Sequence, residues 1–435
     1  MKKNIFVVGL DDFNLQLMQA VRGAENYAFH TLLPRAEIAS PRSYPMGELL
    51  ERARAELRRF PGSVHAIIGH WDFPTTTLVQ MLREEWGLPT PSLEAVLRCE
   101  HKYWSRLLQQ EIMPAHTPRF AAFDPFAVDP LRQIGLDFPF WVKPVKAHSS
   151  NLGFRIDDEQ DFERALRQVR AGIGRFAEPF NYVLNQADLP PSVRPVDGYY
   201  CLAEEITAGR QLTLEGYMVE GEGIVYGAVD SFRAEGCSSF NRYQYPSTLP
   251  EWLLRYMADA SSRLMERIGL DNAPFNIEWF YDEEREQAWV LEVNPRISKS
   301  HAPLFELVDS ASHHEVAIDL ALKQRPSFPR HSGRYSCAAK FMLRERRDGV
   351  AVRTPTAAEI AAIEREVPGT RIQLSVEDGM RLSDLQNQDS YSYEVAVIFI
   401  GGHDEAELLQ KYQRCVDALP FEYAYTDADQ ETVIG

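Results

Sequence analysis

Apolar runs alternate with amphipathic segments over the first hundred positions of the chain. Residues 4–10 (NIFVVGL) and 64–71 (VHAIIGHW) are apolar enough for buried strands, and segments with helical periodicity follow at 13–21 and 77–86. Strands that alternate with helices in this way pair in parallel, with the helices covering the sheet. We therefore expect an N-terminal α/β domain over residues 1–98.

The next part of the chain predicts two long helices separated by strands. One helix is expected over residues 92–110, where Ser92 and Glu94 suit its N-terminus. Residues 139–230 predict a β-rich region. The second helix is expected over residues 250–268, which carry apolar side chains at helical spacing.

A hairpin and a final α+β module complete the expected organisation. Residues 275–294 (FNIEWFYDEEREQAWVLEVN) predict two strands around a polar turn at 282–287. The proline-containing stretch 326–334 is typical of a boundary, and mixed strands and helices are expected after it. The fold class is thus α/β with α+β, in three expected domains: 1–98, 99–325 and 326–435.

Composition is that of an ordinary globular protein without a membrane span. The 435 residues are 45% hydrophobic and 25% charged, and no stretch approaches the roughly 20 apolar residues that a spanning helix needs. The apolar run after Lys2 and Lys3 is short and ends in Asp11 and Asp12, so it predicts a first strand rather than a signal peptide. The five cysteines are scattered and form no CxxC pair, which favours a reducing compartment, and we expect a cytoplasmic protein.

The formal net charge of −17 bears on the class of partner. A chain this acidic repels nucleic acid unless it concentrates basic residues on one face, and no such cluster is seen in the sequence. We therefore expect neither a nucleic-acid nor a membrane partner. An anionic substrate would need local positive charge placed against the overall field.

The stretch WVLEVNPRIS, residues 289–298, begins as a buried strand and ends in polar side chains at alternate positions. Side chains alternate between the two faces of a strand, so Glu292, Asn294 and Arg296 share one face, and Glu278 lies near Glu292 if the hairpin folds evenly. Carboxylate and amide oxygens suit Mg²⁺ that also holds phosphates. An exposed hairpin face with a structural Glu–Arg pair explains the same spacing, and the pattern alone leaves both interpretations open.

Lys143 lies between an aromatic strand and a proline in FPFWVKPVKAHSSNLGF, residues 138–154. We expect this lysine to be at least half buried, which requires an anionic partner. The polar loop 148–151, followed by Gly153, offers backbone N–H groups and hydroxyls that suit a phosphate. A surface hairpin with a lysine that extends to solvent is the alternative.

Two acids, Glu204 and Glu205, end an apolar strand in CLAEEITAGRQLTLEG, residues 201–216. An acid at a strand end can accept a hydrogen bond from an adenine amino group, while the backbone that follows contacts the edge of the base. Two solvated acids at a strand end are the alternative interpretation.

Taken in order, these motifs resemble the ATP-grasp superfamily, and within it the carboxylate–amine ligases that include bacterial L-amino-acid and dipeptide ligases. The resemblance covers most of the chain. It rests on Lys102 in a helix before a proline-containing loop, and on these segments: FWVKPV, HSSNLGF, AEEITAGRQ, YPSTLPEWL, NIEWF and VLEVNPRIS, the last with the family's E-x-N-x-R.

The resemblance implies an ATP-grasp fold with an N-terminal Rossmann-like pre-ATP-grasp domain, and ATP and Mg²⁺ as cofactors, with Mn²⁺ as an alternative ion. Lys143 and Arg296 would be catalytic, Arg296 by stabilising an acyl phosphate. Glu278, Glu292 and Asn294 would bind the metal. Nucleotide binding would fall to Lys102, Lys143, Ser149, Ser150, Glu204, Glu205, Ile206, Thr207 and Gln211.

Three departures from the family pattern stand out. Gln211 occupies the place of a ribose-binding glutamate, and the phosphate loop has one glycine, Gly153, where the family commonly has more. After Arg296 the family usually has small residues, whereas this chain has Lys299, Ser300 and His301, which we expect to shape the acceptor pocket.

The implied reaction joins a small carboxylate to a small amine, amino acids among them, through an acyl phosphate, with release of ADP and phosphate. A biotin carboxylase-like enzyme, which shares E-x-N-x-R, is one alternative. A non-catalytic ATP-binding regulator is another, supported by Gln211 and by the altered loop. Because dimers are common in the superfamily, a homodimer is also an expectation.

Overall fold

The computed structural model describes residues 2–39, 43–147, 151–233, 239–385 and 392–425. The chain folds into two compact units. Unit 1 consists of Met1–Tyr226, Leu249–Lys299 and His314–Ser327. Unit 2 consists of Gly227–Thr248, Ser300–His313 and Phe328–Gly435. These two units do not test the three domains expected from the sequence, which stay a prediction.

A parallel sheet at the N-terminal end of unit 1 confirms the predicted βαβ pattern. Its strand order is β2–β1–β3, and both neighbours of β1 run parallel to it. Its strands are β1 (Lys3–Val8), β2 (Tyr27–Leu32) and β3 (Ala66–Gly69). The accompanying helices are α1 (Asp12–Gln19), η1 (Ala24–Asn26), α2 (Arg35–Ile38), α3 (Met46–Arg59) and α4 (Thr75–Glu85). Ile5, Val7 and Ile68 form a core with Ile318 of α11 (His314–Ala321).

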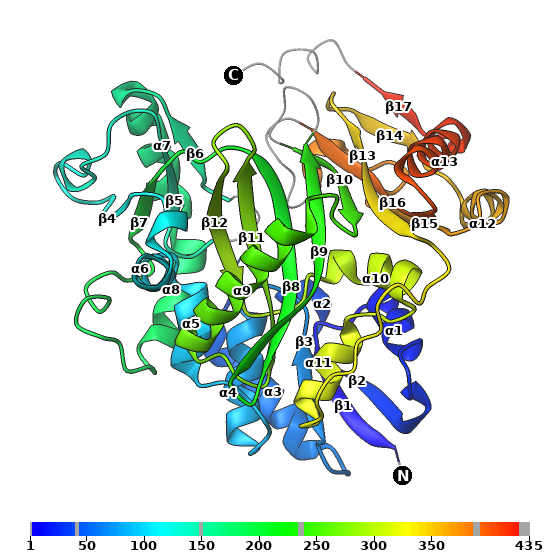
Figure 1. Cartoon of the computed structure of the whole chain (residues 1–435), viewed down its shortest axis with the longest axis horizontal. Coiled ribbons are helices and arrows are strands. Elements are labelled where there is room, and N and C mark those ends of the chain that lie inside the picture. Colours follow the sequence, from blue (N-terminus) through cyan, green and yellow to red (C-terminus); the bar gives the residue numbers. More distant parts are fainter. Residues whose placement is uncertain (1, 40–42, 148–150, 234–238, 386–391, 426–435) are drawn as a thin grey trace. The chain divides into compact units, whose positions relative to one another are not determined.

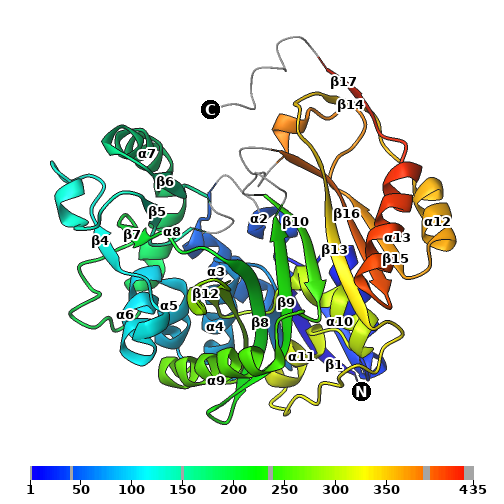
Figure 2. The same ribbon diagram turned by 45° about the horizontal axis from the view of Figure 1, so that its top comes forward.

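The region predicted as β-rich is instead mixed. Four short strands form an antiparallel sheet in the order β4–β7–β5–β6. They are β4 (Phe120–Phe123), β5 (Phe140–Pro144), β6 (Phe154–Ile156) and β7 (Cys201–Glu205). Helices α7 (Glu159–Gly172) and α8 (Gly174–Leu184) lie between β6 and β7 in the chain, and α7 packs beside β6 (Figures 1 and 2). The prediction missed α7, although its apolar residues Phe162, Leu166 and Val169 recur at helical spacing.

The helix predicted over residues 92–110 is two helices. They are α5 (Leu93–Glu100) and α6 (Lys102–Ile112), and short 3₁₀ turns follow at η2 (Pro114–His116) and η3 (Leu131–Gln133). His101 separates the helices with an extended backbone (φ −87°, ψ 95°), and its side chain accepts a hydrogen bond from the backbone N–H of Trp104. The apolar periodicity continues across this break, which is why the sequence concealed it. As a result, Lys102 begins a new helix.

The predicted hairpin is confirmed, and a third strand of unit 1 pairs with it. Its strands are β11 (Ala273–Asp282) and β12 (Gln287–Asn294), and β11 also pairs with β8 (Arg210–Val219). Helix α9 (Glu251–Ile268) packs beside β8 (Figures 1 and 2). The indole of Trp279 in β11 donates a hydrogen bond to the hydroxyl of Ser261 in α9 at 3.2 Å. Gly269 ends α9 in the left-handed conformation (φ 75°), which favours glycine at this position.

Unit 2 contains mixed strands and helices, as the sequence predicted after residue 334, and it also includes β10 and part of β9. Strand β9 (Glu222–Arg233) carries the chain from unit 1 into unit 2. The strands of unit 2 continue in the order β9–β10–β13–β16–β15, and β14 pairs with β17. The remaining strand bounds are β10 (Phe240–Tyr245), β13 (Cys337–Glu345), β14 (Val350–Arg353), β15 (Thr370–Leu374), β16 (Tyr393–Gly402) and β17 (Glu422–Ala424).

Helices cover both faces of this sheet in unit 2. Ile398 and Ile400 of β16 form a core with residues of α12 (Ala357–Glu366) and α13 (Glu405–Ala418), which lie together in the orange and red part of the chain (Figures 1 and 2). Phe399 points to the opposite face, because side chains alternate along a strand, and lines a pocket with residues of α10 (Ala302–Asp309). Short 3₁₀ turns lie at η4 (Lys299–His301) and η5 (Leu382–Asp384).

None of the helices in the described part of the chain is both long enough and apolar enough to cross a membrane.

Candidate functional site

Three neighbouring strands of unit 1 carry polar side chains at alternate positions on one face. On β8 these are Gln211, Thr213 and Glu215, all of which are buried. In the β8–β11 register Thr213 pairs with Glu278, and Glu215 pairs with Asn276. In the β11–β12 register Glu278 pairs with Glu292, and Asn276 pairs with Asn294. Strand pairing therefore gathers these polar groups into a patch.

The two carboxylates predicted as metal ligands are direct cross-strand neighbours. A bulge follows Glu278 in the register, so the pairing shifts immediately beyond the pair. Burial, and then the charge of Glu292, raise the pKa of Glu278 to about 7. Burial acts in the same direction on Glu292, but the Lys102 and Lys143 ammonium groups outweigh it and lower the pKa of that carboxyl. At neutral pH Glu292 is therefore ionised, while Glu278 is close to its pKa and is only partly ionised.

Two asparagine amides extend this patch toward Arg296. Asn294 donates a hydrogen bond from its side-chain nitrogen to the side-chain oxygen of Asn276 at 3.0 Å. Asn276 in turn donates to the backbone carbonyl of Arg296 at 2.8 Å. Because Asn294 uses its side-chain nitrogen in this contact, its side-chain oxygen can still accept, as the predicted ligand role requires.

Arg296, the predicted catalytic arginine, is paired with a residue that follows β3. Its guanidinium lies 2.6 Å from a carboxylate oxygen of Asp72. Burial opposes the charge, but Asp72 outweighs it and raises the pKa of Arg296 above its ordinary value. Strand β12 ends at Asn294, as Pro295 predicted, so Arg296 lies in the segment beyond the strand.

Lys102 reaches the carboxylate pair from the first turn of α6. Its ammonium lies 2.9 Å from a Glu292 oxygen and donates to the Ala147 carbonyl at 2.8 Å. Burial disfavours the charged form, but Glu292 outweighs it and raises the pKa of Lys102. Lys102 is therefore a charged, largely buried cation beside one of the candidate metal ligands.

The anionic partner expected for Lys143 is Glu204. The Lys143 ammonium lies 2.6 Å from one oxygen of Glu204, and Arg106 lies 2.5 Å from the other. Burial acts against ionisation of Glu204, but the two cations outweigh it and lower its pKa to about 2. Burial, and to a smaller extent Arg106, lower the pKa of Lys143. Lys102, Lys143, Arg106, Glu204 and Glu292 all line one small pocket.

The other predicted nucleotide residues are less closely grouped. Glu205 is partly exposed and pairs with Arg119 at 2.6 Å, and the half-buried Ile206 and Thr207 follow β7. Gln211 donates to Glu278 at 2.9 Å, so in this structure it contacts the carboxylate pair, while a ribose contact stays a prediction. Ser149 and Ser150 lie outside the described residues.

Four residues of this region were missed by the sequence analysis. Asn276 lies two positions before Glu278 in the same strand, and that spacing was a usable signal. Arg106, Asp72 and Glu215 have partners too distant in the chain for any spacing to reveal. Arg106, for example, donates to the carbonyls of Val290 and Leu291 at 2.7 and 3.0 Å. Lys299, a departure from the family pattern, lies over the Trp71 ring at 4.3 Å.

The donor set fits a hard divalent cation. Among the described residues, no group of three or more His, Cys, Asp and Glu side chains is arranged to hold a metal. The candidate here has two carboxylates and one amide oxygen, from Glu278, Glu292 and Asn294. Mg²⁺ is commonly bound by one or two carboxylates together with substrate phosphates and water, so a small protein donor set is what it requires.

Comparisons with known proteins bear on the domain and the fold of this chain. Residues 136–302 match the family described as "ATP-grasp domain". No curated protein matches the sequence. Among solved structures, an L-amino acid ligase from Bacillus licheniformis is similar over 98% of this chain and 99% of its own, with a TM-score of 0.71 and 16% identity.

Two further structures were determined with nucleotides. Carboxyaminoimidazole ribonucleotide synthase from Aspergillus clavatus, complexed with ATP, has a TM-score of 0.65 and 13% identity over 96% of this chain and 98% of its own. The biotin carboxylase domain of Hydrogenobacter thermophilus 2-oxoglutarate carboxylase, a dimer with MgADP and bicarbonate, has a TM-score of 0.63 and 13% identity over 97% and 91%. The predicted superfamily and fold are confirmed: this chain contains an ATP-grasp domain and has the fold of the ATP-grasp ligases.

Proposed function

We propose that this protein is an ATP-dependent carboxylate–amine ligase that forms an amide bond and releases ADP and phosphate. One observation carries the proposal: Lys102, Lys143 and Glu292 line one pocket, and Glu292 is paired across the hairpin with Glu278. Two cations beside two carboxylates suit a nucleotide triphosphate bound with a metal ion.

The lysines are proposed to bind the phosphates of ATP. Each ammonium group is now held by a carboxylate, Lys102 by Glu292 and Lys143 by Glu204. Phosphate oxygens would share these ammonium groups, so the cations are in place before the nucleotide arrives. Mg²⁺ held by Glu278, Glu292 and Asn294 would offset the charge of the phosphates. Mg²⁺, and Mn²⁺ as an alternative, are part of this proposal.

In the proposed first step, an oxygen of the substrate carboxylate attacks the γ-phosphorus of ATP, and the bond from that phosphorus to the ADP oxygen breaks. The product is an acyl phosphate. An amine lone pair then attacks the acyl carbon, the carbon–oxygen bond to phosphate breaks, and the nitrogen loses a proton. Lys143 and Arg296 stabilise the negative charge, and Asp72 fixes the Arg296 guanidinium.

The substrates are proposed to be small molecules, with amino acids as the first class to test. Support comes from the whole-chain similarity to an L-amino acid ligase. The experiment is a phosphate-release screen of the twenty amino acids in pairs with ATP and Mg²⁺, followed by mass spectrometry of the products. ADP and a mass equal to the two amino acids less one water support the proposal. ATP hydrolysis without a condensed product in any pair contradicts it.

Biotin carboxylation is the second candidate, because a biotin carboxylase domain is similar over 97% of this chain. The same assay with bicarbonate and free biotin separates the two reactions. ADP release that requires bicarbonate and biotin, and no amine, favours carboxylation. A homodimer, as in that structure, stays a proposal that sedimentation of the purified protein tests.

A further inference from the structure

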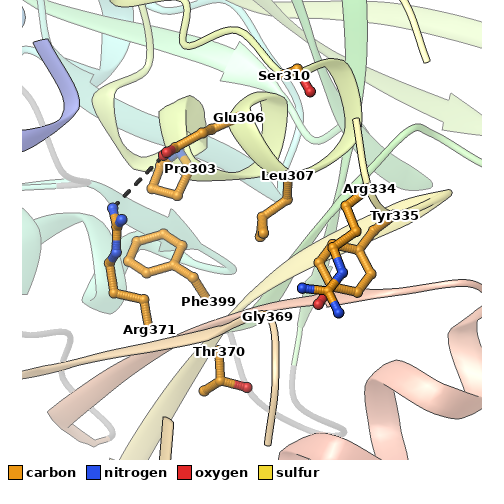
Figure 3. A pocket seen from close by; sticks show the side chains of 10 residues that line it. All are labelled: Pro303, Glu306, Leu307, Ser310, Arg334, Tyr335, Gly369, Thr370, Arg371 and Phe399. Carbon is orange, nitrogen blue, oxygen red and sulfur yellow. Dashed lines mark ion pairs between the residues drawn. The ribbon is translucent and has the colours of Figure 1, made fainter. Parts of the chain in front are cut away.

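Unit 2 contains a pocket of about 350 Å³ that shares no residue with the candidate ATP site. It lies between helix α10 and strands β15 and β16, and its walls come from residues far apart in the sequence (Figure 3). The residues that line it are Pro303, Glu306, Leu307, Ser310, Arg334, Tyr335, Gly369, Thr370, Arg371 and Phe399.

The middle of this pocket is apolar. Phe399 and Tyr335 are 2% and 7% exposed, so their rings form buried walls. In Figure 3, Leu307 of α10 and Phe399 of β16 lie between the Glu306–Arg371 side and the Arg334–Tyr335 side. A ligand that places an aliphatic or aromatic group here removes apolar surface from water, which favours binding by roughly 25 cal/mol per Å².

One wall presents a positive and a negative group together. The Arg371 guanidinium and the Glu306 carboxylate are 3.8 Å apart, beyond hydrogen-bonding distance, and their side chains are 40% and 34% exposed (Figure 3). A simple anion would be attracted by the Arg371 guanidinium but repelled by the Glu306 carboxylate. A ligand that carries both an ammonium and a carboxylate can satisfy both groups at once.

Tyr335 forms the side of the pocket opposite Glu306 and Arg371 (Figure 3). Its hydroxyl is buried and has no hydrogen-bond partner in the described part of the chain. A Cβ on Gly369 would lie 2.3 Å from that hydroxyl, so glycine at this position is what allows the ring to sit there.

We propose that this pocket binds a free α-amino acid with an apolar side chain, in its zwitterionic form. The carboxylate pairs with Arg371, the ammonium pairs with Glu306, and the side chain packs between Leu307 and Phe399. The site is distinct from the candidate ATP and metal site, with which it shares no residue.

The test is photo-crosslinking of the full chain with photo-leucine, a diazirine analogue of leucine, in the absence of ATP. Peptide mass spectrometry then locates the label. We expect label in segments 303–310, 334–335 and 369–371, and in the peptide that contains Phe399. Excess L-leucine should compete, whereas N-acetyl-leucine, which lacks the ammonium, and leucinamide, which lacks the carboxylate, should not.

Glu306→Gln and Arg371→Gln should each lower labelling of these segments by about tenfold, because each removes one charge-assisted contact. Arg365→Gln, an exposed residue of α12 outside the pocket, is the matched control and should label like the unaltered protein. Leu307→Trp, which fills the pocket without changing its charges, should also lose the label. Circular dichroism checks that each variant is folded.

The proposal is overturned if the label falls only on unit 1 peptides, or if N-acetyl-leucine competes as well as leucine. Undiminished labelling in both charge variants also overturns it. The readout does not use turnover, so it stands apart from the phosphate-release screen. A failed ligase assay with specific labelling of unit 2 would reject the proposed function and keep this site.

Discussion

Two charge clusters in unit 1 differ in how their carboxylates are balanced. Glu204 lies between Arg106 and Lys143, at 2.5 and 2.6 Å, and these cations hold its pKa at about 2. Glu278 instead faces another carboxylate across the hairpin, and its pKa is raised to about 7. No residue in the described ranges forms an ion pair with Glu278.

The difference separates a self-sufficient cluster from one that needs an added cation. The chain supplies the counter-charges of Glu204, so that cluster is electrostatically balanced without an added ion. In the described part of the chain, the one ion pair made by the Glu278–Glu292 pair is that of Lys102 with Glu292. A divalent ion would supply the missing charge, which is why we propose a metal site at the hairpin and not beside Glu204.

The largest effect is expected from breaking the self-sufficient cluster. Arg106→Met leaves Glu204 with one cation and removes the donor to the Val290 and Leu291 carbonyls, so we expect about 3–5 kcal/mol of destabilisation. Urea unfolding measures this change. Arg267→Met, which breaks the exposed Arg267–Glu111 pair, is the control and should cost less than about 1 kcal/mol. Equal losses would refute the distinction between the two pairs.

The next effect concerns the cluster that needs a cation. Glu292→Gln should lower ligase turnover by about 100-fold or more, because it removes a metal ligand and the partner of Lys102, while the protein remains folded. Steady-state ADP release measures the loss. Glu283→Gln, in the exposed turn of the same hairpin, should behave like the unaltered enzyme. Full turnover by the Glu292→Gln variant would show that Glu292 is not a ligand of the catalytic metal.

A smaller effect follows from the depressed pKa of Glu204. Because its pKa is about 2 in the folded protein, against 4.5 for an ordinary glutamate side chain, its stabilising contribution is present above pH 4.5 and lost as the pH falls toward 2. The stability difference between the unaltered protein and Glu204→Gln should therefore shrink by about 2 kcal/mol between pH 6.5 and pH 3. Urea titrations at several pH values test this. A constant difference would show that Glu204 is not held ionised by its partners.

The sequence revealed the parts of the site that follow from local geometry. Alternation along one strand placed Glu292 beside Asn294, and an even hairpin turn brought Glu278 opposite Glu292, as the register confirms. The expectation that a buried Lys143 needs an acid was also correct. Such predictions succeed because strand period and turn length act over only a few residues.

Contacts between distant segments could not be predicted in this way. Arg106 pairs with Glu204, which is 98 residues away in the sequence, and Arg296 pairs with Asp72, which is 224 residues away. The break at His101 was also concealed, because apolar spacing continues from α5 into α6. That break places Lys102 at the start of a helix, whereas the sequence predicted it in the middle of one.

The most direct test of the account is calorimetric titration of ADP into the unaltered protein and into Glu278→Gln, each with Mg²⁺ and with a chelator. We expect the unaltered protein to bind ADP at least tenfold more tightly with Mg²⁺ than without it. In Glu278→Gln that difference should largely disappear, while metal-free ADP still binds through Lys102 and Lys143. An undiminished Mg²⁺ dependence in the variant would contradict the metal site at the hairpin.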